Sequence, residues 1–334
     1  PDAILSGRPY PIKAFVSFAG NPVLSWPNAA KVARAFEALD FVVAIDLYLT
    51  ETARLADIVL PATTFMERTD LNDSLRVPLA PLSYVHLRQQ AVTPRHAARP
   101  EWRIIGDLAA RLGMGEHFPF KDAEALIDHV LEPAGLTARR LREQHPSGLI
   151  YAEAAPGRFR GEGFPTPSGK IELHSPALEA AGFDPVPTYR EPVESPVSRP
   201  DLAAKYPLIL TTGARVEATS GTWTHNLPLL RTLVAENWVE IHAETAGPLG
   251  IHHGARVAVE TPRGRIVLPA KVSDDVAPGV VAIPFGWGHD AGGHLARSTP
   301  GANPNVLIDD AAVDPIGGTP AYRSGLCRVV PLGS

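Results

Sequence analysis

The chain has 334 residues, of which 45% are hydrophobic and 20% are charged. This length allows two or more domains, and the composition is ordinary for a globular protein. The net charge of −5 disfavours a nucleic-acid-binding surface. No apolar run approaches the ~20 residues of a membrane helix, so we expect no direct membrane insertion. The single cysteine, Cys327, excludes a disulfide framework and any four-cysteine metal site within these residues.

The first predicted strand covers 12–18 and ends in a tight turn, Ala19-Gly20-Asn21-Pro22. Gly20 can adopt backbone angles that other residues avoid, and the residue before a proline is extended. Such a turn brings backbone N–H groups close to a bound anion. A helix follows over 28–39, with Asn28 as its cap and apolar residues at helical spacing.

The segment 41–68 has the pattern strand, polar loop, turn, strand. Its apolar start, 41–45, indicates a strand buried on both faces in a parallel sheet. Asp46 ends this strand, at the edge where ligands bind in open α/β sheets. The oxygen-rich residues Thr50 to Thr52 come next, and a second short strand, 57–60, stops at Pro61. We therefore expect the polar groups to gather at one edge of the sheet.

The middle of the chain carries less chemistry. We expect a strand over 84–92, a helix over 102–113 closed by Gly113, and one or two helices within 121–146. Residues 150–205 are rich in proline and weakly periodic, which indicates an ordered connector.

The last third predicts many short strands. One strand, 207–212, runs directly into Gly213, and others cover 239–242 and 280–284. Residues 255–260 and 265–271 alternate around a turn and predict a hairpin. Several short strands with regular turns are typical of a small β-barrel.

Several motifs add a resemblance to this pattern. The segment TETARLADIVLPATTFMER (50–68) resembles the T-x-T-A-x-x-A-D-x-V-L-P-A-x-x-x-x-E stretch of the molybdopterin oxidoreductases, the dimethyl sulfoxide reductase family. The turn at 20–22 is similar to the family's G-x-N-P loop. Residues 163–173 resemble its G-F-x-T-P-S-G-K-x-E-L signature, and 303–323 resemble its ending. The sequence departs from the family pattern in three places. Ala214 stands between Gly213 and Arg215, the histidine that often follows is absent with Thr219 near its place, and Arg323 replaces the usual lysine.

The resemblance implies a fold and a domain order. We expect a Rossmann-like molybdopterin-binding α/β domain over 10–115. A helical and proline-rich connector follows over 116–204. A double-psi β-barrel domain that binds the molybdopterin dinucleotide covers 205–331.

The resemblance also implies which residues contact the cofactor. The implied residues are Gly20, Asn21, Pro22, Asp46, Thr50, Thr52, Arg68, Thr212, Gly213, Arg215, Ser220, Thr222, Asn303, Asn305 and Arg323. For Arg68, the alternative of an ordinary surface residue stays open.

The implied cofactor is molybdopterin guanine dinucleotide, two per full-length chain, with molybdenum or tungsten. The implied reaction is two-electron redox or oxygen-atom transfer on a small-molecule substrate, with electrons passing through an iron–sulfur cluster. The chain starts without a methionine, and we expect the cluster and all catalytic and metal-ligating residues to lie upstream. We therefore expect this chain alone to be inactive and name no catalytic residue in it. We expect an iron–sulfur electron-transfer subunit as a possible partner, and a cytoplasmic location. Within the family, the sequence is most similar to the thiosulfate/polysulfide reductase or formate dehydrogenase branch, and acetylene-hydratase-like members are also similar.

Two other readings stay open. The chain could belong to a non-catalytic iron–sulfur electron-transfer subunit that keeps the fold but has lost the metal, or to a module that binds the pterin without turnover. His289 and His294 lie in what we interpret as a flexible loop, where a metal site is disfavoured because no carboxylate stands at a fixed helical spacing. No G-x-S-x-G elbow, G-x-G-x-x-G fingerprint or Walker loop is present.

Overall fold

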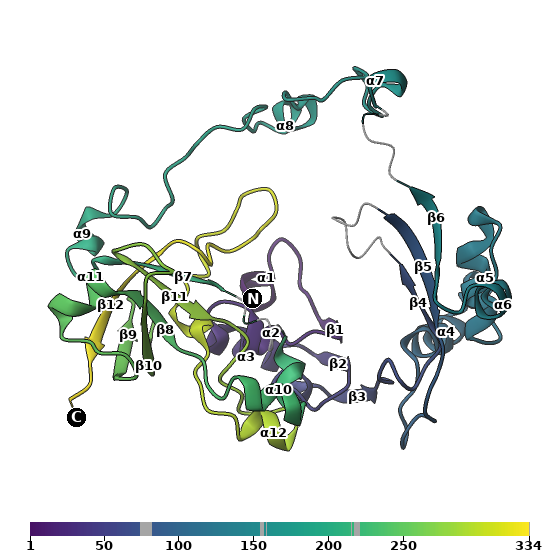
Figure 1. Ribbon diagram of the computed structural model, residues 1–334, viewed down its shortest axis with the longest axis horizontal. Helices are drawn as coiled ribbons and strands as arrows, with labels where there is room; N and C mark the ends of the chain where they lie inside the picture. Colours follow the sequence, from purple (N-terminus) through teal and green to yellow (C-terminus); the bar gives the residue numbers. More distant parts are fainter. Residues whose placement is uncertain (74–81, 154–156, 158, 215, 217–220, 334) are drawn as a thin grey trace. The chain divides into compact units, whose positions relative to one another are not determined.

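The computed structural model describes residues 1–333 except 74–81, 154–156, 158, 215 and 217–220 (Figure 1). The chain forms two compact units. The barrel unit joins Pro1–Pro61 to Glu191–Ser334, and the antiparallel unit is Ala62–Arg190. The boundaries expected at 115 and 204 from the order of motifs divide the chain differently, and they stay predictions.

The N-terminal part of the barrel unit holds a three-stranded parallel sheet. Its strands are β1 (Ala14–Phe18), β2 (Phe41–Asp46) and β3 (Ile58–Pro61), in the order β1-β2-β3. The predicted strands and their parallel direction are confirmed. Burial on both faces of β2 is only partial, because Val42, Ala44 and Ile45 are buried whereas Phe41 is 43% exposed.

Helix α3 (Ala29–Glu37) connects β1 to β2 and packs on the sheet. Asn28 caps it as predicted, since its side chain accepts a hydrogen bond from Lys31 N. Its buried face contributes Val32 and Phe36 to a small core with Val42. Helix α2 (Pro22–Ser25), which the sequence pattern did not predict, starts at the turn after β1.

Six strands of the same unit close into a barrel (Figure 1). Around the barrel the order is β10-β8-β11-β7-β12-β9. Two neighbouring pairs, β7 with β11 and β8 with β10, are parallel, and the other pairs are antiparallel. The strands are β7 (Leu208–Ala214), β8 (Val239–His242), β9 (Arg256–Glu260), β10 (Arg265–Ser273), β11 (Val280–Pro284) and β12 (Gly325–Pro331).

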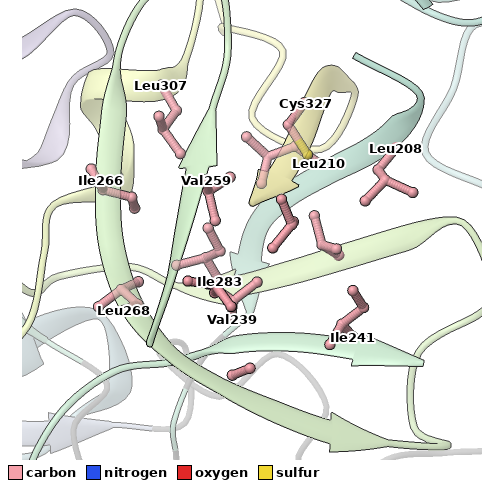
Figure 2. Close-up of a cluster of buried hydrophobic side chains, with 14 of the residues drawn as sticks. Leu208, Leu210, Val239, Ile241, Val259, Ile266, Leu268, Ile283, Leu307 and Cys327 are labelled. Carbon is pink, nitrogen blue, oxygen red and sulfur yellow. The ribbon is translucent and has the colours of Figure 1, made fainter. Parts of the chain in front are cut away.

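The barrel interior is an apolar core. Figure 2 shows side chains such as Leu210, Ile241 and Ile283 from different strands meeting inside it. Cys327 belongs to this core, and burial raises the pKa of its thiol well above the ordinary value. The cysteine is therefore a packed apolar side chain rather than a reactive one. The predicted barrel is confirmed, although β12 was not among the predicted strands.

The antiparallel unit is built on a second sheet of order β4-β5-β6. Its strands are β4 (Asp70–Asp73), β5 (Leu82–Arg88) and β6 (Leu149–Glu153). Helices α5 (Ala123–Leu131) and α6 (Ala138–Gln144) cover one face, and their apolar residues join Val85 and Leu87 in one core (Figure 1). The sequence pattern indicated the strand near β5 and the helices, and it missed β4 and β6.

The remaining helices are short, apart from α4 (Glu101–Arg111), which was predicted and ends before Gly113. No helix in the described part of the chain is long and apolar enough to cross a membrane. The short helices are α1 (Asp2–Ser6), η1 (Ala53–Leu55), η3 (Gly115–His117), η4 (Glu132–Ala134), α7 (Phe159–Glu162), α8 (Pro176–Ala180), α9 (Pro200–Ala203), η6 (Thr222–Asn226), α10 (Pro228–Leu233), α11 (Ala243–Ala246), η7 (Gly247–Leu249), α12 (His294–Arg297) and η8 (Pro304–Leu307).

Candidate functional site

The predicted residues after β1 and β2 meet at one edge of the parallel sheet. Asn21 is buried, and its Nδ2 donates to Glu51 Oε2 over 2.6 Å. Its Oδ1 accepts from the backbone N of Thr52 at 3.2 Å and from Thr52 Oγ1 at 2.9 Å. Thr52 Oγ1 in turn accepts from Val23 N, just after Pro22 at the start of α2. The amide of Asn21 is thus engaged inside the protein, where it ties the two loops together.

The unusual backbone of the first turn lies one residue earlier than predicted. Ala19, not Gly20, has a left-handed conformation, with φ of 49°. Gly20 has no positive φ, and its carbonyl accepts a hydrogen bond from Ser17 Oγ at 2.9 Å. The prediction that Gly20 supplies the special backbone angle is therefore wrong, because Ala19 makes the turn and a serine hydroxyl fixes the next peptide.

Glu51 is the centre of the polar edge. Its Oε1 accepts from the backbone N–H groups of Asp290 and Ala291, at 3.1 and 3.0 Å, which belong to the loop after β11. Burial alone would raise the pKa of this carboxyl, but hydrogen bonds from His289, Asn21 and Ala291 outweigh burial and hold the pKa at about 2. Glu51 is therefore a buried, fully bonded carboxylate that joins the sheet edge to a barrel loop.

His289 lies in this barrel loop, and it is not solvent-exposed. Its side chain is only 4% exposed, and its Nδ1 is 3.3 Å from Glu51 Oε1. Its Nε2 is 2.9 Å from Nδ1 of His225, which is fully buried against Trp287. Burial, with the nearby His289, lowers the pKa of His225 to about 4. The segment was interpreted as a flexible loop, and in the structure its His289 side chain is buried and in contact with Glu51. The sequence pattern did not indicate this contact, because Glu51 is 238 residues away in the sequence.

Asp46 and Thr50 flank the same edge. Asp46 Oδ1 accepts from the backbone N of Leu47 at 2.7 Å and of Tyr48 at 3.4 Å. Burial raises the pKa of Asp46, and these two N–H groups oppose the shift. Its Oδ2 accepts no hydrogen bond from the residues that the structure describes, so it is available to a ligand. Thr50 Oγ1 accepts from the backbone N of Ala53, the first residue of η1, at 3.2 Å.

At the barrel end, the predicted residues come from β7 and the stretch before β12. Thr212 is buried and bonds the carbonyl of Tyr322 through both its N–H and its hydroxyl, at 2.9 and 3.0 Å. Gly213 lies against Arg323, since a β-carbon at Gly213 would be 2.6 Å from Arg323 Nε. Arg323 is exposed and makes no ion pair with any residue in the described ranges. This arrangement leaves a guanidinium free beside a glycine at the end of β7.

Asn303 and Asn305 hold the barrel against α2. The Nδ2 atoms of both side chains donate to the carbonyl of Leu24, at 3.0 and 2.8 Å. Asn303 Oδ1 also accepts from Asn305 N at 2.9 Å, which caps η8. The two asparagines therefore serve the protein itself in this structure, and a role of either one toward a pterin stays a prediction.

Of the remaining predicted residues, Thr222 begins η6 and is partly buried. Arg215 and Ser220 lie outside the described residues.

Arg68 lies in the antiparallel unit and is already paired. Its Nη1 bonds both carboxylate oxygens of Glu101, at 2.8 and 2.7 Å, and the carbonyl of Thr63. Its Nε is 3.3 Å from Asp70 Oδ2. These bonds connect the start of α4 to the start of β4, so the guanidinium has a clear structural role.

Two family models match this sequence. The model described as molybdopterin oxidoreductase matches residues 6–111, and the one described as molydopterin dinucleotide binding domain matches residues 208–326. The second range contains barrel strands β7 to β11 and the start of β12, with Thr212, Gly213 and Arg323. The first range contains the parallel sheet with Asn21, Asp46 and Glu51. The chain belongs to the molybdopterin oxidoreductase family.

Named relatives support this placement. Acetylene hydratase of Syntrophotalea acetylenica is 34% identical over 97% of this chain and 44% of its own length. The thiosulfate reductase molybdopterin-containing subunit PhsA of Salmonella typhimurium is 29% identical over 97% of this chain and 44% of its own length. The F420-dependent formate dehydrogenase subunit alpha of Methanocaldococcus jannaschii is 32% identical over 90% of this chain and 40% of its own length.

A solved structure agrees with the sequence relatives. Acetylene hydratase from Pelobacter acetylenicus matches with a TM-score of 0.83 and 32% identity, covering 99% of this chain and 46% of its own. The chain thus spans less than half the length of the relatives it matches. These comparisons support an enzyme family, and they do not support the alternative of a non-catalytic iron–sulfur subunit.

The residues present fit a dinucleotide of this kind. A phosphate needs an available cation, and the exposed guanidinium of Arg323, which lies against Gly213, supplies one. A pterin ring edge needs free donors and acceptors, and Asp46 Oδ2 is one such acceptor. The sequence did not indicate that Glu51, His225 and His289 lie in contact, because these contacts join segments that are distant in the sequence.

Proposed function

We propose that this chain supplies the dinucleotide-binding part of a molybdenum or tungsten enzyme that uses two molybdopterin guanine dinucleotides. The proposal includes a Rossmann-like assignment for the parallel-sheet region and a double-psi assignment for the barrel. The observation that carries it is the meeting of loops from both regions. Glu51 after β2 bonds the loop after β11, and Asn303 and Asn305 before and in η8 bond Leu24 in α2.

We assign the role of each residue from the polar atoms that have no partner among the described residues of the protein. Arg323 would bind a phosphate of the dinucleotide with its exposed guanidinium, and Gly213 would leave room for the Arg323 side chain beside β7. Asp46 would accept a hydrogen bond from an amino group of the ligand through Oδ2. Asn21, Glu51 and Thr52 would hold the loop that carries Asp46 and Thr50 in place. When bound, the metal–pterin group would supply two-electron redox chemistry or oxygen-atom transfer.

The wider assembly is part of the same proposal. The substrate is a small molecule, and an iron–sulfur cluster elsewhere in the full-length protein carries electrons, with a separate iron–sulfur subunit as a possible partner. The thiosulfate/polysulfide reductase and formate dehydrogenase branch remains our preferred placement. A cytoplasmic location is proposed and can be tested by cell fractionation.

The proposal is tested by metal and pterin analysis of the full-length gene product, purified without oxygen. Molybdenum or tungsten with two pterin guanine dinucleotides per chain is the expected result, and it justifies a screen of formate, thiosulfate and polysulfide. Iron and sulfide without either metal would contradict the proposal.

A further inference from the structure

Glu51, His289 and His225 form a continuous chain of buried groups within the barrel unit. Glu51 Oε1 is 3.3 Å from His289 Nδ1, and His289 Nε2 is 2.9 Å from His225 Nδ1. The Glu51 and His289 side chains are 5% and 4% exposed, and His225 is fully buried. Burying three titratable groups in contact costs free energy unless each donor nitrogen faces an acceptor atom of its neighbour.

The carboxylate fixes the proton positions along this chain. Glu51 is ionised and accepts only, so His289 Nδ1 must donate to it. In a neutral His289 the other nitrogen, Nε2, is then an acceptor, and it accepts a hydrogen bond from the N–H of His225 Nδ1. His225 Nε2 is left without a proton, as a bare acceptor.

The end of this group of side chains at His225 lacks a hydrogen-bond partner among the residues that the structure describes. Within those residues, His225 Nε2 is buried and has no partner, and Nε1 of the adjacent Trp287 has none either. The two rings are 4.2 Å apart between centroids. Buried polar atoms without partners are rare in native proteins and call for an explanation.

We propose that Glu51, His289 and His225 form a proton relay that takes up one proton and stores it on His289. A proton that binds His225 Nε2 pushes the proton on His225 Nδ1 across to His289 Nε2. No covalent bond other than these N–H bonds changes, and the balance is one proton taken from water. The stored charge is then an imidazolium paired with the Glu51 carboxylate, and His225 Nε2 has turned from an acceptor into a donor.

The role of the relay rests on the proposed function, because its loops are those assigned to the cofactor. There it would supply one positive charge to offset the negative charge of a bound dinucleotide, so His225 and His289 are positioning residues. Two other charged groups near the relay are Asp290, in the same loop as His289, and Arg54, whose Nη1 donates to the Asp290 carbonyl. Two more, His294 and Arg297, lie on α12, which packs on η6. The relay differs from these groups in being buried.

The test is nitrogen-15 NMR of the 334-residue chain labelled in histidine, recorded without cofactor. At pH 8 we expect both His225 and His289 to carry their proton on Nδ1. On acidification both rings should change in one step with a shared midpoint, because the uptake of one proton rearranges the N–H groups of both rings. In Glu51→Gln the shared midpoint should fall by about one pH unit or more, since the opposite charge is gone.

His294→Gln is the matched control, and it should leave the step unchanged. A proton on Nε2 of either ring at pH 8 would overturn the relay, and so would two separate midpoints. The wild-type spectrum decides by itself if a variant does not fold. If both histidines change in one step but the full-length protein contains no pterin, the relay is retained and the proposed function is overturned. If the full-length protein contains pterin but the two histidines titrate separately, only the relay is overturned.

Discussion

The barrel unit has two polar regions, one around Glu51 and one around Arg323, and they differ in whether their polar groups are hydrogen-bonded within the protein. Around Glu51, buried groups bond one another, and the carboxylate receives two backbone N–H groups, an amide and an imidazole. Around Arg323, an exposed guanidinium lies against Gly213 without an ion pair in the described part of the chain.

This difference separates residues that hold the site from residues that a ligand can reach. A family resemblance groups Asn21 and Arg323 together as cofactor contacts. The hydrogen bonds divide them, because Asn21 is engaged with Glu51 and Thr52 whereas Arg323 is available. Changes near Glu51 should therefore reduce stability first, and changes at Arg323 should reduce cofactor binding first.

The largest effect is expected for Glu51→Gln. The Gln side chain would turn an amide toward groups that are themselves donors, leaving buried N–H groups unpaired. We expect a loss of about 3–5 kcal/mol in the free energy of unfolding. Urea denaturation measures it, with faster hydrogen exchange of the Ala291 amide as the local signal. Glu37→Gln, on the exposed end of α3, is the control and should change little. A loss at Glu51 no greater than in that control would contradict the account.

The same carboxylate predicts a dependence on pH. Its pKa is about 2 in the folded chain and near 4.5 when unfolded. A lowered pKa stabilises the fold above pH 4.5, and this contribution is lost as the pH falls toward 2, to a total of about 3 kcal/mol. Urea midpoints measured from pH 6 to pH 3 should fall more steeply in the wild type than in Glu51→Gln. Parallel curves would show that Glu51 is not the responsible group.

Gly288→Ala tests the loop that carries His289. Gly288 has φ of 81°, and a β-carbon there would lie 2.3 Å from the backbone N of Asn303. Backbone cannot move aside as a side-chain end can, so we expect a loss of about 2–3 kcal/mol. Thermal unfolding measures it. Gly279→Ala is the matched control, since it has a φ of 78° but no atom within 4 Å of the added carbon. Equal losses in the two variants would show that the close contact with Asn303 does not matter.

The elements that sequence predicted well are those with local signals. The strands β1, β2 and β3 and the hairpin β9–β10 show apolar periodicity, and α3 has its cap in Asn28. The missed strands β4 and β6 pair with β5, and β6 comes from about 60 residues further along the chain. Their own residues, such as Asp70 and Asp73, carry no strand pattern.

The candidate site residues came from the family resemblance rather than from local periodicity. The resemblance placed Asn21, Thr52, Gly213 and Arg323 among the candidates, and the structure brings the first two together and the last two together. It did not indicate the bonds of Glu51 to the loop of His289, because the two segments are joined only in the fold.

The smallest stability effect and the sharpest functional one are expected for Arg323→Ala. Its side chain is exposed and unpaired among the described residues, so the free energy of unfolding should change by less than about 0.5 kcal/mol. Arg328→Ala is the matched control, because Arg328 is also exposed but paired with Glu260.

The most direct test of the account is the pterin dinucleotide content of the full-length protein carrying Arg323→Ala, measured beside Arg328→Ala and the wild type. We expect Arg323→Ala to be as stable as the wild type and to retain less of the dinucleotide, while Arg328→Ala retains it fully. Full retention in Arg323→Ala would contradict the claim that the free guanidinium at the end of the barrel binds the cofactor.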